Sequence, residues 1–209
     1  METHRTYGWH HARQQCSHGY LLPYVTQQLK KILPGRPGRI VDLGCGNGAV
    51  TAELAQLGHD VVGVDVSADG IELAKQAFPT LRFEVGSVYD SQLEESIGSA
   101  ADVVVSLEVL EHLFHPRELF RQSARLLRPG GTLILSTPYH GYWKNLALAV
   151  AGAWDRHLTV GWDGGHIKFF SMKTAAAMAR ECGFEVVELA GVGRLPYLWM
   201  SMFLVARKP

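Results

Sequence analysis

The chain has 209 residues, 47% of them hydrophobic and 19% charged, and a formal net charge of zero. This length suits one domain with a substantial core, and the neutral charge argues against a nucleic-acid partner. Cys16, Cys45 and Cys182 form no CxxC pair, and the first 20 residues contain no apolar signal-peptide core. A cytoplasmic setting without a disulfide framework is therefore expected.

Segments typical of strands and of helices alternate along most of the chain. Apolar runs predict strands over residues 39–43, 61–64, 81–85, 101–107, 132–136, 184–189 and 198–206. Helical spacing bounded by Ser, Pro or Gly predicts helices over 21–33, 49–57, 68–77, 116–127 and 172–182, and an apolar helix over 146–154. This alternation predicts an α/β fold with a doubly wound, mostly parallel sheet.

The most informative stretch is Ile40 to Gly48, where an apolar run meets three glycines spaced G-x-G-x-G. Glycine lets the backbone approach a ligand where a Cβ atom would clash. Asp65 ends the next apolar run, 21 residues after Gly44, where an acid can accept hydrogen bonds from both hydroxyls of a ribose. The dinucleotide fingerprint is spaced G-x-G-x-x-G, so this turn favours a different nucleoside ligand over NAD.

The stretch Val41-Asp42-Leu43-Gly44-Cys45-Gly46-Asn47-Gly48 resembles the first motif of the class I S-adenosylmethionine (SAM) methyltransferases. The resemblance covers Arg39 to Lys208 and implies a Rossmann-like sheet of seven strands in the order 3-2-1-4-5-7-6, with the last strand antiparallel. It also implies SAM as cofactor and S-adenosylhomocysteine (SAH) as product.

On this basis the chain is expected to be a single domain of four segments. These are an N-terminal helical flap (1–38), a SAM-binding core (39–138), a substrate-lid insertion (139–170) and the C-terminal part of the sheet (171–209). Tyr7 and Trp9 in the first segment are candidates for closing over the cofactor, as N-terminal helices do in this family.

The resemblance assigns cofactor contacts to ten residues: Asp42, Gly44, Cys45, Gly46, Asp65, Val66, Gly86, Ser87, Leu107 and Glu108. Asp42 is expected to meet the methionine ammonium, directly or through water, with helix capping as its alternative role. Asp65 is expected to bind the ribose. Many relatives carry an acid for the adenine amino group where this chain has Ser87, which leaves that contact weaker here.

The fourth predicted strand leads into Glu108-Val109-Leu110-Glu111-His112, which resembles the E-V-x-E-H segment of quinone-biosynthesis O-methylating enzymes. Histidine has an unperturbed pKa near working pH, so His112 and His166 are the candidates for removing a proton from an acceptor hydroxyl. The alternative is that Glu111 and His112 hold this loop in place and that His166 stabilises the fold.

The segment after the fifth strand mixes aromatic, apolar and a few polar residues, which suits a partly apolar acceptor. Tyr139, His140, His157 and Asp163 are its candidate substrate residues. No two of its histidines have zinc-type helical spacing, so no metal is predicted. The apolar helix of this segment is compatible with a buried lid or with peripheral contact to a membrane or lipid.

Together these features predict a SAM-dependent methyltransferase acting on a small, partly apolar molecule, with oxygen as the favoured acceptor atom. Two alternatives remain at this level, an NAD-dependent oxidoreductase with a Rossmann domain and a non-catalytic SAM-binding relative. The neutral charge and the absence of an N-P-P-Y-type motif argue against nucleic acid as the acceptor. The sequence does not indicate an oligomeric state.

Overall fold

A computed structural model describes residues 18–158 and 165–209 of the chain. Its centre is a seven-stranded sheet in the order β3-β2-β1-β4-β5-β7-β6, the order that the resemblance implied. The strands are β1 (Arg39–Leu43), β2 (Asp60–Asp65), β3 (Arg82–Val85), β4 (Ala101–Leu107), β5 (Leu127–Pro138), β6 (Glu185–Val192) and β7 (Ser201–Arg207).

The first five strands run parallel, and β7 runs antiparallel to both of its neighbours, β5 and β6. In the middle of the sheet Ile40 of β1 pairs with Val61 of β2 on one side and with Val103 of β4 on the other. The order reverses between β1 and β4. The carboxyl ends of these two strands therefore border the crevice in which open α/β sheets bind ligands.

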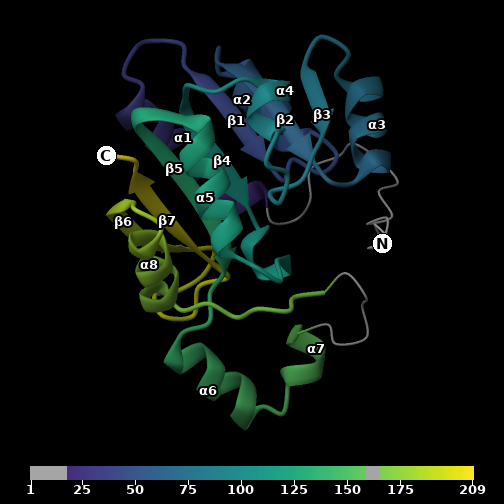
Figure 1. The fold of residues 1–209 in the computed structure, drawn as a ribbon. Coiled ribbons are helices and arrows are strands. Elements are labelled where there is room, and N and C mark those ends of the chain that lie inside the picture. The colour runs from purple at the N-terminus through teal and green to yellow at the C-terminus, as the bar shows by residue number, and fades with distance from the viewer. Residues whose placement is uncertain (1–17, 159–164) are drawn as a thin grey trace.

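Helices cover both faces of the sheet (Figure 1). On one face lie α1 (His18–Ile32), α2 (Ala49–Gln56) and α3 (Ala68–Ala77), and on the other α4 (Leu93–Ile97), α5 (Arg117–Leu126) and α8 (Met172–Glu181). Phe203 of β7 and Phe120 of α5 are fully buried. Burial of one such side chain contributes about 1.5 to 3 kcal/mol relative to its exposure.

Helix α1 is fixed to the far edge of the sheet by polar and aromatic contacts. The ring of Tyr24 stacks on that of Phe203 at a centroid distance of 4.2 Å, and its hydroxyl donates to Glu188 of β6 at 2.8 Å. Gln28 donates to the same carboxylate at 3.1 Å. This helix is thus a packed layer of the fold, whereas Tyr7 and Trp9 lie outside the described residues.

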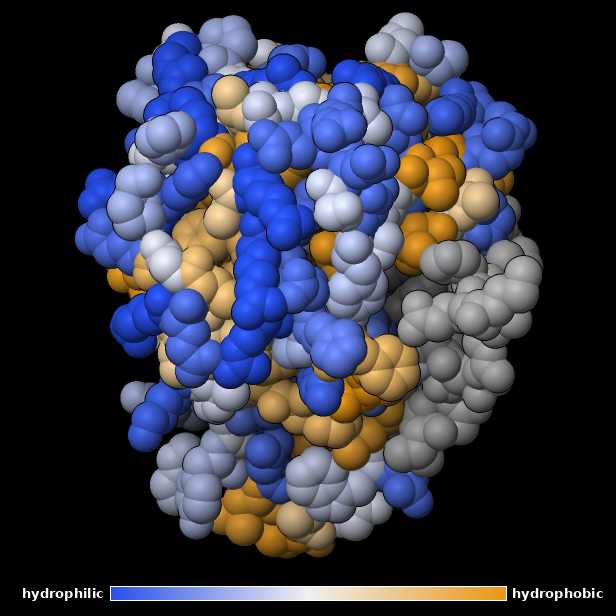
Figure 2. Space-filling view, in the orientation of Figure 1, coloured by the Kyte–Doolittle hydropathy of each residue, from blue (hydrophilic) through white to orange (hydrophobic). Residues whose placement is uncertain are grey.

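Two short helices, α6 (Tyr142–Val150) and α7 (Trp154–Leu158), follow β5 and lie beyond the end of the sheet (Figure 1). The sequence predicted one helix over 146–154. The chain instead breaks at Gly152, whose φ of 58° is left-handed and unfavourable for other residues. Figure 2 shows hydrophobic surface at the same end of the molecule, where Val150 is 82% exposed.

The boundaries of the last strand also differ from the prediction. Strand β7 begins at Ser201 rather than at position 198, and Tyr197, Leu198 and Met200 are exposed residues of the preceding loop. Within the described residues, no helix is long and apolar enough to cross a membrane.

Candidate active site

The glycine turn after β1 lies at the carboxyl edge of the sheet. Gly44, Gly46 and Gly48 have φ values of 91°, 55° and 78°, which are left-handed and strained for any residue with a side chain. The amides of Gly44 and Cys45 donate to the carbonyl of Val64 at 2.7 and 3.0 Å, so the turn is tied to the end of β2. The turn therefore favours glycine at these three positions and lies at the crevice edge beside the end of β2.

Asp65, the last residue of β2, holds the glycine turn through a hydrogen bond. Asp65 accepts a hydrogen bond from the Gly46 amide and another from the Ser67 amide, each at 2.8 Å. Burial raises the pKa of this carboxyl, which the two amides partly offset. The helix cap itself is Ser67, whose hydroxyl accepts from the Gly70 amide at 3.3 Å. Asp65 is thus fixed in orientation beside the turn, where a ribose-binding acid is expected.

Asp42 lies deeper, beneath the glycine turn. Its carboxylate accepts a hydrogen bond of 2.6 Å from the hydroxyl of Thr51 on α2, and it is only 2% exposed. Burial raises its pKa to about 7. The contact with Thr51 joins the end of β1 to the first turn of α2. The side chain of Cys45 is likewise buried, packing with Ile71 and Phe83.

The residues expected near the adenine form the next part of the edge. Val66 is 41% exposed, and the Gly86 amide donates to the carbonyl of Asp65 at 2.9 Å. A Cβ atom on Gly86 would lie 2.7 Å from Cδ1 of Leu93, so a side chain at this position would have to displace that of Leu93. The Ser87 hydroxyl accepts a hydrogen bond from the Tyr89 amide at 3.2 Å, so part of its capacity is used within its own turn.

The end of β4 carries Leu107 and Glu108. Leu107 is half-buried and packs beside the α1 layer. Glu108 has a φ of 56°, a left-handed conformation that costs about 1 to 3 kcal/mol in a non-glycine residue. Its carboxylate accepts hydrogen bonds from Ser136 at 2.7 Å and Ser201 at 3.2 Å, and burial raises its pKa to about 7. These contacts direct Glu108 toward the ends of β5 and β7.

Glu111 and His112 form a single 3-10 turn, Leu110–His112, that lies against His166 from a distant part of the chain. The Nε2 atoms of His112 and His166 lie 3.9 and 4.0 Å from Oε1 of Glu111. Oε2 of Glu111 accepts a 2.9 Å hydrogen bond from Thr137. Burial raises the pKa of Glu111 well above its usual range, with the charge of Glu108 adding to the effect.

The backbone fixes the same cluster. The carbonyl of Glu111 accepts from the amides of Ile167 and Lys168 at 3.0 Å each, and Nδ1 of His112 lies 3.2 Å from the carbonyl of Gly165. Burial lowers the pKa of His166, which leaves its imidazole neutral and able to accept a proton. The structure therefore joins the two candidate bases at one buried carboxylate.

The predicted substrate residues divide into two groups. Tyr139 is 8% exposed and packs edge-to-face on Trp199 at 5.1 Å, as part of the core. His140 lies 6.1 Å from His157 and 5.0 Å from Phe169, measured between ring centroids. Burial lowers the pKa of His140 to about 4, with the charge of Lys144 contributing. Asp163 lies outside the described residues.

Sequence reasoning missed three hydroxyl groups that bind the acids Glu108 and Glu111, and a buried lysine on α6. Ser136, Thr137 and Ser201 hold Glu108 and Glu111. The Ser-Thr pair at the end of a parallel strand was a usable signal, because carboxyl ends meet at one edge. Lys144 of α6 is 8% exposed, and its Nζ atom donates to the Met200 carbonyl at 3.5 Å.

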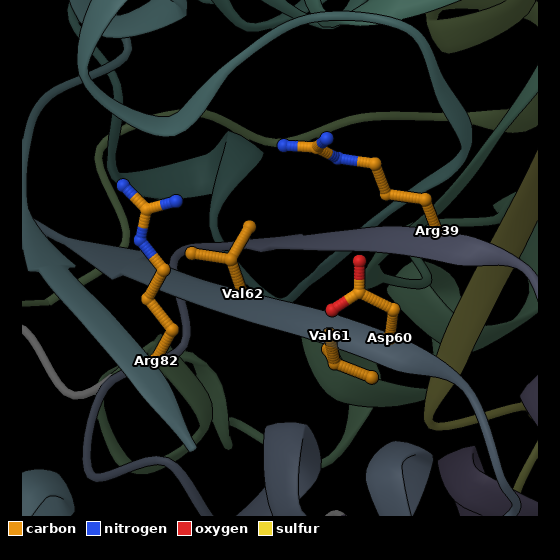
Figure 3. A pocket seen from close by; sticks show the side chains of 5 residues that line it. All are labelled: Arg39, Asp60, Val61, Val62 and Arg82. Carbon is orange, nitrogen blue, oxygen red and sulfur yellow. The ribbon is translucent and has the colours of Figure 1, made fainter.

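Two surface pockets lie outside the glycine turn and the Glu111 cluster. The one in Figure 3, of about 150 Å³, is at the opposite edge of the sheet, where Arg39, Asp60 and Arg82 begin their strands. Its arginines donate to the Ile97 and Ser96 carbonyls at 2.6 Å each, so they satisfy the end of α4. A larger groove of about 450 Å³ is lined in part by Phe114, Lys168 and Phe169, which adjoin the cluster in sequence.

The sheet order, the glycine turn and the acid at the end of β2 together define a SAM-dependent methyltransferase of Rossmann-like fold. The family model described as "Methyltransferase domain" matches residues 9–189, and the chain belongs to this family. The expectation of SAM as cofactor is thereby confirmed.

Individual relatives agree. A ubiquinone biosynthesis O-methyltransferase of Burkholderia pseudomallei is 31% identical over 169 residues, which cover 78% of this chain and 71% of that protein. A protein of the same description from Cereibacter sphaeroides is 31% identical over 202 residues, covering 89% and 78%. Magnesium protoporphyrin IX methyltransferase from Synechocystis, solved with bound SAH, shares the fold with a TM-score of 0.68 at 19% identity, over 90% of this chain and 82% of that one.

Proposed function

We propose that the protein transfers the methyl group of SAM to a hydroxyl oxygen of a small, partly apolar molecule. The observation that carries this proposal is the contact between Gly44 and Val109. A Cβ atom on Gly44 would lie 2.3 Å from Cγ2 of Val109, so the cofactor turn touches the segment Glu108 to His112. An acid–histidine cluster therefore stands next to the turn that is proposed to hold the donor.

In this proposal the ten cofactor residues named from the sequence surround SAM, with Asp65 at the ribose. Methyl transfer is an in-line displacement, in which the acceptor oxygen forms a bond to the methyl carbon while the bond from carbon to sulfur breaks. The protein accelerates it mainly by holding donor and acceptor in line and excluding water. His112 or His166 takes the hydroxyl proton, because a hydroxyl becomes a good nucleophile as it loses that proton.

The acceptor is proposed to lie between this cluster and His140. Phe169 contacts His140 and also lines the groove of about 450 Å³, a volume within the usual range for small-molecule sites. The exposed apolar side chains of α6, among them Trp143 and Val150, are proposed to cover an apolar acceptor or to rest on the lipid that carries it. The names of the relatives support an oxygen acceptor related to quinone precursors.

The test uses matched acceptors with the purified full chain. A hydroquinol with a short apolar tail, the same ring without the tail, and the corresponding aromatic amine are incubated with SAM. We expect the hydroxyl compounds to gain one methyl group by mass spectrometry, the tailed one with the higher kcat/KM. Methylation of the amine alone would overturn the proposal of an oxygen acceptor.

The base assignment is tested with His166→Ala beside His59→Ala as a control on the opposite edge of the sheet. We expect the first variant to lower kcat by about 100-fold, within the usual range for general-base catalysis, with SAM affinity unchanged. The control is expected to keep the parent kcat. Equal kcat values for both variants would remove His166 from the reaction.

A further inference from the structure

One carboxylate oxygen of Glu111, Oε1, is buried without a hydrogen-bond partner among the described residues. The side chain is 1% exposed, and no hydrogen-bond donor of the described residues reaches its Oε1, although Oε2 is bonded to Thr137. A buried carboxylate oxygen without a partner loses its hydration with nothing in exchange, and such atoms are rare in folded proteins. A water molecule or an ion bound at the atom is one explanation for such a site.

Two imidazoles approach this atom from different segments. The Nε2 atoms of His112 and His166 lie 3.9 and 4.0 Å from Oε1, and one ligand atom from each of the three residues fits within a mutual distance of 4.8 Å. Metal bonds to nitrogen and oxygen are about 2.0 to 2.2 Å long, so ligand atoms around one ion lie about 3 to 3.5 Å apart. The ligand atoms of the three groups lie up to 4.8 Å apart, so they need to close by up to about 1.3 to 1.8 Å to share an ion.

We propose that Glu111, His112 and His166 bind one divalent transition-metal ion. The donor set of two imidazole nitrogens and one carboxylate oxygen suits Zn²⁺, Co²⁺ or Fe²⁺ better than Mg²⁺ or Ca²⁺, which prefer oxygen ligands. Three protein ligands leave at least one coordination position for water or for an acceptor oxygen. The spacing of histidines along the sequence predicted no metal, because these ligands come from two segments that only the fold brings together.

Neighbouring groups hold the three proposed ligands in orientation, as is usual around a metal ion. Nδ1 of His112 lies 3.2 Å from the Gly165 carbonyl, which directs Nε2 toward the carboxylate. Thr137 holds the other oxygen of Glu111, and two backbone amides bond to the Glu111 carbonyl. Outer contacts of this kind fix ligand orientation and commonly change metal affinity by about 10- to 100-fold. The charge of the ion also offsets the two adjacent buried acids, Glu108 and Glu111.

This inference rests on the proposed site but is tested without any acceptor or SAM, so the two can fail separately. A ring nitrogen that binds the ion cannot also take the acceptor proton, so with the ion bound its charge, rather than a histidine, would lower the pKa of a bound acceptor hydroxyl. Chelator-treated protein is titrated with Co²⁺, whose visible absorption reports its ligands, and Zn²⁺ is then added as competitor. The titrations use a His10→Ala/His11→Ala background, since adjacent histidines in the sequence also attract Co²⁺. We expect one ion per chain, displaced by Zn²⁺.

Glu111→Gln and His166→Ala are each expected to weaken Co²⁺ binding at least about tenfold. Glu111→Gln keeps the side-chain volume and an oxygen for Thr137. If that variant does not fold, His166→Ala tests the proposal, because the side chain of His166 is 26% exposed and its removal perturbs the core less. The matched control is His115→Ala, which removes an exposed histidine three positions from His112 and is expected to leave affinity unchanged. The proposal is wrong if the parent protein binds no Co²⁺, or if His115→Ala and His166→Ala weaken binding equally.

Discussion

The Gly46 amide donates a 2.8 Å hydrogen bond to Asp65, so the acid that is proposed to bind the ribose also holds the glycine turn in place. Its second oxygen is used by the Ser67 amide. Asp65→Asn replaces one of these acceptor oxygens with an amide donor. We therefore expect SAM and SAH affinities to fall by at least about tenfold, or about 1.4 kcal/mol, in isothermal titration calorimetry.

Asp60→Asn is the matched control, because it makes the same change at the first residue of the same strand, on the opposite edge of the sheet. It is expected to leave both affinities as in the parent. If Asp65→Asn also retains them, the ribose contact lies elsewhere and the carboxylate only supports the turn.

The contact between Gly44 and Val109 gives a second prediction. Gly44→Ala places a Cβ atom 2.3 Å from Val109 at a residue with φ of 91°, so both strain and overlap arise. Overpacking of this kind typically costs about 1 to 3 kcal/mol. We expect weaker SAM binding and lower kcat, because the turn and the Glu108 segment are displaced together.

Gly58→Ala separates the two effects, since Gly58 has a φ of 90° but nothing within 4 Å of its missing Cβ atom. It is expected to lower the thermal midpoint without changing SAM affinity. Val109→Ala should partly restore SAM binding to Gly44→Ala, as neighbouring sites couple energetically. Additive effects of Gly44→Ala and Val109→Ala would show that the contact does not transmit the change.

Much of the sheet could be predicted from local pattern. The bounds of β1 and β4 agree with the sequence prediction residue for residue. Each strand is an apolar run that is followed directly by a glycine or a polar residue. Strand β5 starts at Leu127, five residues earlier than predicted. The prediction was late because the Pro-Gly-Gly sequence within Arg128 to Gly131 is typical of a turn. The fold extends the strand there by pairing, and the Gly130 amide bonds to the Lys208 carbonyl at 2.9 Å.

The candidate site was less accessible to sequence reasoning wherever two distant segments meet. Asp65 and the glycine turn adjoin within one β-α-β unit, so their spacing alone indicated a joint site. His166 lies 54 residues beyond His112, and no local periodicity relates them. Their meeting at Glu111 depends on the backbone bonds from Ile167 and Lys168, which only the folded chain forms.

Lys144 yields a prediction about pH. Burial lowers its pKa to about 8 from 10.5, with the charge of Arg194 contributing. The unfolded chain therefore binds more protons at this group between pH 8 and 10.5, and the lysine contributes increasing stability as pH rises through that range. Relative to Lys144→Met, the parent protein should gain stability from pH 8 to 10.5, measured by denaturant unfolding.

Near pH 7 the Lys144→Met variant is expected to be as stable as the parent or more so, because it removes a buried charge with one long hydrogen bond. Lys168→Met, which changes an exposed lysine in the loop before α8, serves as control. A difference between parent and Lys144→Met that stays constant across the pH range would mean that Lys144 is solvated.

Asp102 has the opposite pH dependence. Arg36 donates to its carboxylate at 2.8 Å, the Arg39 amide at 3.0 Å and Arg128 at 2.9 Å. The hydrogen bond from Arg36 is the largest of the causes that lower the pKa of Asp102 to about 2, from 3.8. Because the folded pKa is the lower one, this stabilisation is present above pH 3.8 and is lost as pH falls to about 2.

Asp102→Asn should therefore be less stable than the parent by about 1 to 2 kcal/mol near neutral pH, the scale of charge-assisted hydrogen bonds to a largely buried carboxylate. The difference should shrink as the pH of the urea titration is lowered from 5 toward 2. Asp90→Asn, at an exposed loop position, supplies the baseline for removal of one surface carboxylate. If the difference between Asp102→Asn and the parent is the same at both ends of the titration, the ion pairs with Arg36 and Arg128 do not stabilise the fold.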